Sequence, residues 1–390
     1  MDIYEIQEII NLKLADLFNK NGIKNFRLTS LGNSIATGYS IVRTTKPLLA
    51  RNESLNEIMS SNGIAVETNS VARPQDNNDE HIFEWLSTNK TVGEINKMVQ
   101  HDFANTRTSR PPIYGLNQQE VKEAYPSDNN ARLQDLLKES DADLANVVIY
   151  NGATGSFLDG ITRNGTLRQK LTYGITRDLT SIESTLKWIQ SQNRDNNSNT
   201  QVYLCGVPDF LGLGLSAILI NNRLKKIAEE YANVVYVEPL NSKFFYDKYN
   251  KEEKPTGFIG KLFDAILQGK RVDVHYDEEE YIKFSNDIFE SILENYIPTQ
   301  ALINLDRRLC GYNNVLQFFQ EDVVDDKQRR NEQINMMIDE EISKIENPND
   351  RIKFLKLLKK YMVGRFPYDF YYLNKKDTLE LIKEKGRKVA

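Results

Sequence analysis

The sequence predicts an α/β protein in which a five-stranded parallel sheet lies between helices, followed by a helical extension. Short apolar runs suited to buried strands alternate with longer stretches of helical periodicity, which is typical of a doubly wound parallel sheet. The run Ala145–Tyr150 shows no polar and apolar alternation, as expected for a strand buried on both faces. After Pro298 the strand pattern ends, and only charged segments of helical character follow.

The order of the expected elements gives a flavodoxin-like three-layer α/β/α arrangement. The expected strands are Phe26–Leu31, Gly63–Val71, Ala145–Tyr150, Gln201–Val207 and Asn233–Pro239. The expected helices include residues 2–20, His81–Leu86, Val92–Phe103, Leu167–Gln190, Leu219–Tyr231 and Glu278–Asn295, the last ended by Pro298. Residues 193–199, rich in asparagine, are expected to form a solvated loop.

We expect three parts in the chain: residues 1–22 as a helix packed on the main domain, 23–297 as the α/β domain, and 298–390 as a helical C-terminal extension. Charge is distributed unevenly between them. Residues Arg351–Lys388 hold twelve basic and four acidic side chains, although the whole chain has a formal net charge of -5. The basic, aromatic residues 351–390 could dock a protein partner, or they could form a helical cap with a solvated lysine face.

The composition favours a cytoplasmic protein. A pI near 5.6 gives no general reason to expect nucleic acid or an anionic membrane as partner. The first residues are acidic, unlike a secretion signal, and no apolar run approaches the roughly 18 residues needed for stable membrane insertion. Cys205 and Cys310 cannot form a framework of disulfides or metal ligands, and Cys205 is expected in the core.

A candidate nucleophile follows the first expected strand. Gly32 permits a sharp turn, and Ser34 stands where a helix could begin. Its Oγ would project from the carboxyl edge of the sheet, where free backbone N–H groups and a helix dipole favour an anion. An acyl-transfer nucleophile needs this environment. The alternative for the same residues is an ordinary turn with an N-cap serine.

The chain has only three histidines, so few residues are candidates for a general base. His275 directly precedes an expected helix, and Asp273 stands two residues earlier. Residues two apart in an extended segment face the same side, so Asp273 can accept from Nδ1 and leave Nε2 free for a serine. The alternative is a surface loop. His81 and His101 lie on expected amphipathic helices, where packed or solvated histidines are commoner.

Together these features resemble the SGNH (GDSL-like) hydrolase family. The matching residues are Gly32-Asn33-Ser34-Ile35, Asp273-Val274-His275 and the stretch from Ile220–Leu224 to Tyr236–Glu238, within about residues 24–297. The resemblance implies Ser34 as nucleophile, His275 as base and then acid, and Asp273 as the group that orients His275. It also implies that the Ser34 N–H is one oxyanion donor.

The sequence departs from the family pattern at three places. Asn33 replaces the usual aspartate before the serine, and Val272 stands where the family has its acid, so Asp273 is a substitute. The chain has Gly152-Ala153-Thr154-Gly155 where the family has Gly-x-Asn-Asp. The missing oxyanion amide could come from Asn151 or be replaced by the Thr154 hydroxyl. A further backbone donor could be Ser70 or Ala72.

The predicted function is therefore a metal-independent serine esterase or lipase-like hydrolase that uses an acyl-enzyme intermediate. By resemblance, its substrate is a small-molecule or carbohydrate ester, such as an O-acetyl sugar. Two alternatives stay open: an O-acyltransferase, or a binding or scaffold protein with weakened chemistry. We expect no cofactor or metal, since Gly206–Gly214 lacks dinucleotide-binding spacing and the sequence has no phosphate loop or metal-ligand motif.

Overall fold

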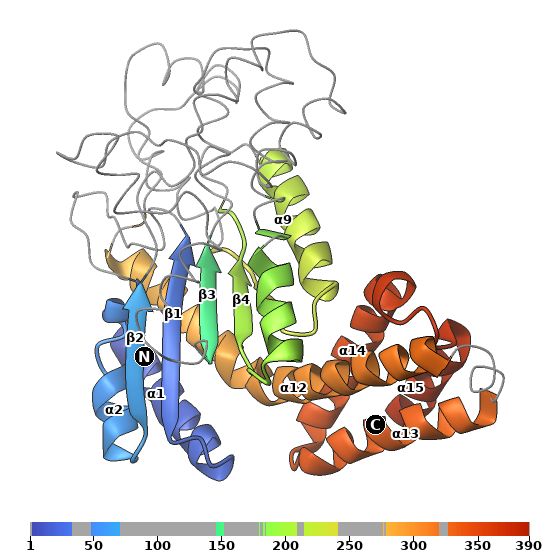
Figure 1. The fold of residues 1–390 in the computed structure, drawn as a ribbon. Helices are drawn as coiled ribbons and strands as arrows, with labels where there is room; N and C mark the ends of the chain where they lie inside the picture. Colours follow the sequence, from blue (N-terminus) through green and yellow to red (C-terminus); the bar gives the residue numbers. More distant parts are fainter. Residues whose placement is uncertain are drawn as a thin grey trace, which may run out of the picture.

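A computed structural model describes residues 2–32, 48–70, 146–151, 179, 182–183, 185–208, 214–240, 276, 278–319 and 327–389. Within these ranges one sheet is present, and all of its strand pairs are parallel (Figure 1). The predicted α/β class and parallel sheet are confirmed. The five strands are β1 (Asn25–Gly32), β2 (Ala65–Ser70), β3 (Val147–Asn151), β4 (Gln201–Cys205) and β5 (Val234–Val237).

The strand order is β2-β1-β3-β4-β5, so β1 lies between β2 and β3. Every residue of β3 and β4 is buried. Strands covered on both faces need apolar side chains in both directions, which explains the unbroken apolar runs in the sequence. Cys205, the last residue of β4, is 1% exposed and belongs to the core as predicted.

Helices lie on both faces of the sheet (Figure 1). One face holds α1 (Ile3–Lys20), α2 (Leu55–Ser61) and the first half of α12 (Glu278–Phe319), and α1 contacts both of the others. The other face holds the helical residues 185–195 and α9 (Gly214–Glu229). This division agrees with right-handed crossovers between parallel strands. Both helices extend beyond the predicted limits, α9 at its start and 185–195 at its end.

The first helix begins as its sequence indicates. Asp2 caps the helix: its side chain accepts from the Tyr4 N–H at 3.3 Å, and its N–H donates to Glu5 at 2.9 Å. Leu14 and Phe18 are completely buried on the sheet side of α1. The centre of the Phe18 ring lies 4.4 Å from that of Phe26 in β1, so the amino-terminal helix packs on this strand.

The prediction that Pro298 ends its helix is wrong. The helix α12 (Glu278–Phe319) is 42 residues long in all and contains Pro298 in its interior. A proline inside a helix removes the hydrogen bond to the carbonyl four residues earlier, here that of Glu294. Lys353 of α14 (Pro348–Asp369) donates instead to the Glu294 carbonyl oxygen at 3.1 Å. The C-terminal helices thus replace the bond that the proline removes.

Two hydrophobic clusters meet near Pro298. Phe289 and Ile292 of α12 belong to the sheet cluster, whereas Leu302 and Leu305 belong to a second cluster formed with the C-terminal helices. Ile297 packs against both. The C-terminal helices that form this second cluster with α12 are α13 (Lys327–Lys344), α14 and α15 (Lys375–Val389). The predicted C-terminal helices are confirmed, while the domain boundaries, including that at residues 297 and 298, stay predictions.

A mostly buried polar network joins the two clusters. Arg194 donates from two nitrogens to the Asp306 carboxylate, at 2.8 Å each, and also to Asp369 at 3.1 Å. The Tyr361 hydroxyl donates to Asp306 at 2.5 Å and accepts from Arg194 at 2.9 Å and Gln190 at 3.3 Å. Burial, reinforced by the Asp306 charge, raises the pKa of Tyr361 well above its ordinary value. The phenol therefore stays protonated and keeps donating.

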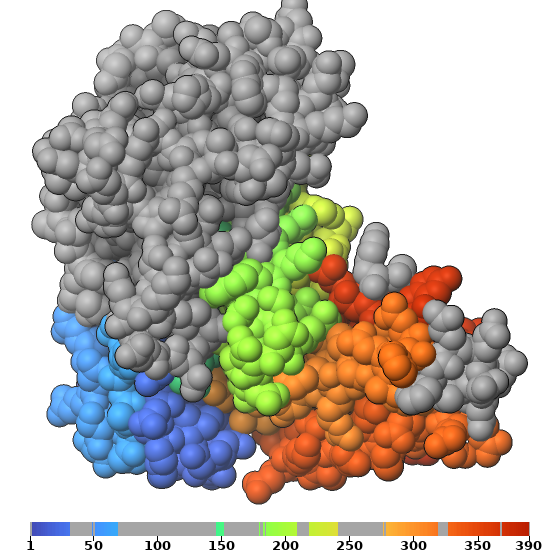
Figure 2. All heavy atoms as spheres, in the orientation of Figure 1, coloured from blue at the N-terminus to red at the C-terminus, as the bar shows by residue number. Residues whose placement is uncertain are grey.

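Basic side chains of the C-terminal part also bind the ends of helices on the sheet. Arg365 donates to the Glu230 carbonyl, one residue beyond α9, at 2.5 Å, and its guanidinium lies over the Tyr231 ring. Arg307 donates to the carbonyls of Asn193 at 2.8 Å and Ser198 at 2.7 Å. Terminal helix carbonyls lack intrahelical partners and attract cations. In Figure 2 the atoms of the C-terminal helices and those of the sheet with its covering helices form one continuous body.

The predicted solvated loop at residues 193–199 is wrong in its first part. The helix continues to residue 195, and Asn193 is only 2% exposed. Its side chain accepts from the Thr200 N–H at 2.9 Å and the Ser198 hydroxyl at 2.7 Å, and donates to the Thr200 carbonyl at 2.9 Å. A side chain whose polar groups form hydrogen bonds within its own turn can be buried although its neighbours are polar.

Among the helices in the described ranges, none combines the length and apolar character that crossing a lipid bilayer requires.

Replacement of Tyr361 by phenylalanine is expected to lower the free energy of unfolding by about 1–3 kcal/mol, because Asp306 and Arg194 lose a buried partner. Urea denaturation followed by circular dichroism measures the change. Tyr371→Phe is the matched control, since Tyr371 is 76% exposed, and it should change stability by less than about 0.5 kcal/mol. Equal stability of Tyr361→Phe and wild type would contradict this role.

Candidate functional site

The carboxyl ends of β1 and of the central strand β3 lie side by side. Gly32, the last residue of β1, is in register with Asn151, the last residue of β3. The chain leaves β1 towards β2 on one side, whereas β3 lies on the other. Ligands of open parallel sheets bind beyond the carboxyl ends at such a switch point. The topology therefore places the candidate site next to Gly32 and Asn151.

Most of the predicted site residues lie outside the described residues. These are Ser34, Ala72, Thr154, Asp273 and His275, together with the other two histidines, His81 and His101. Ser70 and Asn151 are described, and they end the two strands that flank β1. Ser70 is in register with Ser30, and Asn151 with Gly32, so Asn151 lies two residues further towards the carboxyl edge. Asn151 is 1% exposed.

The start of α12 lies near the carboxyl end of β4. Tyr276 is completely buried and packs edge to face on Tyr281, with ring centres 5.1 Å apart. Burial raises the pKa of the Tyr276 phenol well above its ordinary value, and Tyr281 and Cys205 lie near enough to add to the increase. Burial also raises the pKa of Cys205. Cys205 is thus a protonated core thiol, unsuited to nucleophilic catalysis.

Sequence reasoning missed Arg51, which ends the short helix η1 (Leu48–Arg51). Its side chain is completely buried, forms an ion pair with Glu278 and lies over the Tyr281 ring. Arg51 follows the apolar run Leu48-Leu49-Ala50, which is the one local sign that this cation would enter the core. Its partner stands 227 positions later, and only the tertiary fold brings the two together.

The backbone N–H groups of Gly206 and Val207, in the turn after β4, already have hydrogen-bond partners. The Val207 N–H donates to Asn221 Oδ1 at 2.7 Å, and Asn221 Nδ2 donates to the Val207 carbonyl at 2.9 Å. The Gly206 N–H donates to the Val237 carbonyl at 2.9 Å. These amides hold the turn and α9 in place, so they are not donors for an anion at the sheet edge.

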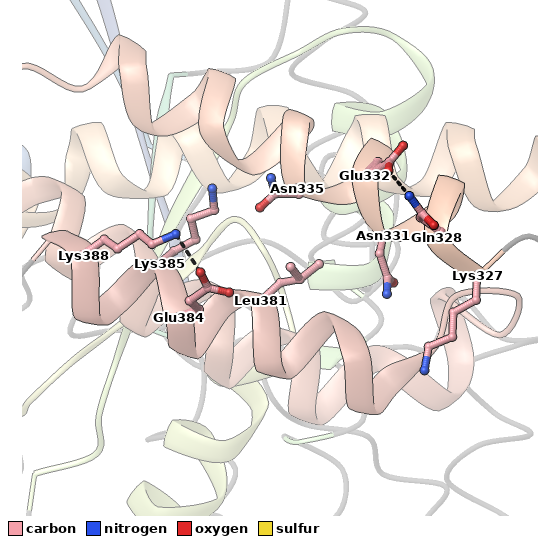
Figure 3. Close-up of a pocket in the computed structure, with 9 residues that line it drawn as sticks. All are labelled: Lys327, Gln328, Asn331, Glu332, Asn335, Leu381, Glu384, Lys385 and Lys388. Carbon is pink, nitrogen blue, oxygen red and sulfur yellow. Dashed lines mark hydrogen bonds and ion pairs between the residues drawn. The ribbon is translucent and has the colours of Figure 1, made fainter.

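A separate open groove of about 550 Å³ lies between α13 and α15 (Figure 3). Three lysines line it, and each pairs with a carboxylate: Lys327 with Asp377 at 3.0 Å, Lys385 with Asp339 at 2.5 Å, and Lys388 with Glu384 at 2.6 Å. Leu381 is the one apolar residue among those that line it. Because its lysines are already paired and only one apolar side chain lines it, the groove shows no marked preference for any ligand.

In the described parts of the chain, no three histidine, cysteine, aspartate or glutamate side chains gather in a way that could hold a metal ion. The fold defines an α/β protein with an all-parallel five-stranded sheet and a candidate site at its carboxyl edge. Comparison with protein-family models and with curated proteins found no match for this chain.

Substitution of Gly206 by alanine is expected to destabilise the turn after β4 by about 1–3 kcal/mol. The added Cβ would collide with the Tyr236 hydroxyl and lie 2.6 Å from Pro239 Cδ. Thermal or urea unfolding measures the loss. Gly311→Ala is the control, because nothing lies within 4 Å of its Cβ position inside α12, and it should stabilise by about 0.5–1 kcal/mol. Equal effects of both substitutions would refute the close contact.

Proposed function

We propose that the protein is a serine hydrolase of the SGNH or GDSL-like type that cleaves a carboxylic ester. The observation that carries this proposal is the position of Gly32, two residues before Ser34, at the carboxyl end of β1, next to the central strand β3. The strand order equals that of flavodoxin-like sheets, which supports a three-layer α/β/α assignment. Asn151 ends the neighbouring strand, where the proposed oxyanion amide is needed.

The proposed reaction proceeds through an acyl-enzyme. Ser34 Oγ attacks the ester carbonyl carbon while His275 Nε2 accepts its proton and Asp273 holds the imidazolium. The tetrahedral oxyanion is stabilised by the Ser34 N–H and by further donors from Ser70, Asn151 or Thr154. Collapse expels the alcohol, which takes the proton from His275. Water then attacks the acyl group by the same steps, releasing the acid and restoring Ser34.

The acceptor in the second step distinguishes hydrolysis from acyl transfer. Water gives the esterase that we propose, and an alcohol would give an O-acyltransferase by the same chemistry. A small-molecule or carbohydrate ester is the proposed substrate, by family resemblance. Both Cys205 and Cys310 are free thiols, which suits the cytoplasmic location included in the proposal.

Hydrolysis of p-nitrophenyl acetate tests the proposed nucleophile and base. Ser34→Ala and His275→Ala should each lower kcat/KM by at least about 10³-fold, since either loss removes the activated nucleophile. Ser61→Ala, which changes an exposed serine of α2, should retain wild-type activity. A folded wild type with neither turnover nor labelling by a fluorophosphonate would overturn the hydrolase and favour a binding or scaffold protein.

A further inference from the structure

The outer face of α14 is basic and has a small apolar part. Its side chains form two adjacent rows in which neighbours are four positions apart: Ile352, Lys356 and Lys360 in one row, and Lys359 and Val363 in the other. The three lysines are exposed, and Val363 is 50% exposed. Lys360 pairs with a glutamate of α9 at 2.7 Å, whereas Lys356 and Lys359 have no ion-pair partner among the described residues. The face therefore presents positive charge around apolar side chains.

The outer face of α1 has the opposite charge in the same pattern. Its two rows, again with neighbours four positions apart, are Glu8, Leu12 and Asp16 in one and Glu5 and Ile9 in the other. All five side chains are exposed, Leu12 at 54% and Ile9 at 38%. Asp16 pairs with a lysine of the same helix at 2.6 Å, but exposed pairs of this kind are weak and easily exchanged. The face therefore presents three carboxylates around two apolar side chains.

The two faces match in length as well as in charge. From Glu5 to Asp16 and from Ile352 to Val363 the chain advances by the same number of residues, so each pattern is roughly 16 Å long. Within one copy the faces do not cover each other: α1 packs on the sheet, α14 belongs to the second hydrophobic cluster, and both faces are exposed (Figure 1). Each face is thus left open to another molecule.

We propose that these faces form a contact between two copies of the chain, in which α1 of one copy packs on α14 of the other. Opposite charges steer the helices together, and the apolar side chains exclude water between them. The chain itself supplies the acidic partner, because its net charge is -5 although residues 351–388 are strongly basic. Each copy has both faces, so two reciprocal contacts can close a two-fold dimer. The contact requires no residue of the proposed hydrolase site.

Sedimentation velocity of the full chain over a concentration series tests the contact. Wild type should self-associate, and about 0.5 M NaCl should weaken the association because salt screens exposed charges. Glu8→Lys with Asp16→Lys should raise the Kd of self-association by at least about tenfold, since two basic faces then meet. Lys356→Glu with Lys359→Glu should do the same with two acidic faces. Glu5 stays unchanged because it caps α1.

Mixing the two charge-reversed variants tests which faces meet. The reversed α1 of one variant then faces the reversed α14 of the other, and the two unreversed faces pair as in wild type. The mixture should therefore form complexes at concentrations at which each variant alone is monomeric. Leu12→Gln, which changes one exposed side chain, should raise the Kd of wild type about fivefold, since it removes an apolar part of the contact.

Lys376→Glu with Lys383→Glu is the matched control, because it makes the same change of charge on exposed lysines of α15. It should associate as wild type does, and circular dichroism checks the folding of every variant. A monomeric wild type overturns the contact, as does an equal loss in the control or a mixture without complexes. If a charge-reversed variant does not fold, Leu12→Gln decides, and an unchanged Kd overturns the contact. If monomeric wild type sediments with phosphatidylserine vesicles, the basic face binds anionic lipid instead.

Discussion

The continuity of α12 is the constraint on which both hydrophobic clusters depend. A helix of 42 residues is roughly 60 Å long, so its first half can cover the sheet while its second half organises the C-terminal helices. Pro298 lies where the clusters meet and would normally weaken the helix at that point. The Lys353 bond to Glu294 and the Gln201 bond to the Tyr296 carbonyl at 2.8 Å supply donors from both sides. The helix is thus continuous because its surroundings support it.

The basic C-terminal region is explained in part by the same packing. Lys360 pairs with Glu229 at 2.7 Å near the end of α9, and Arg365 bonds the carbonyl of Glu230. Exposed pairs such as that of Lys360 contribute little to stability, whereas the partly buried Arg194 and Asp306 pair would be expensive to break. Several cations of residues 351–390 therefore bind the chain's own acidic residues and helix ends. A protein partner for this region stays a prediction.

The sequence was sufficient to predict the parallel sheet but not the contacts that define its surroundings. Buried strands such as β3 and β4 are visible as apolar runs because both faces need apolar side chains. The errors at Pro298 and Asn193 have a shared cause: distant donors or a closed turn satisfy groups that local rules leave exposed. Arg51 was missed for the same reason, since its burial depends on Glu278 and Tyr281. For the candidate site, sequence predicted the sheet edge, whereas the roles of Ser34 and His275 stay predictions.

The topology determines which chain segments meet at the carboxyl edge of the sheet. Parallel strands bring Gly32 and Asn151 to one level, and β4 brings Cys205 near Tyr276 at the start of α12. Any ligand at this edge would therefore meet chain segments from both ends of the domain. What the buried Arg51 adds is a fixed contact between η1 and the first turn of α12, through its ion pair with Glu278 and its position over the Tyr281 ring.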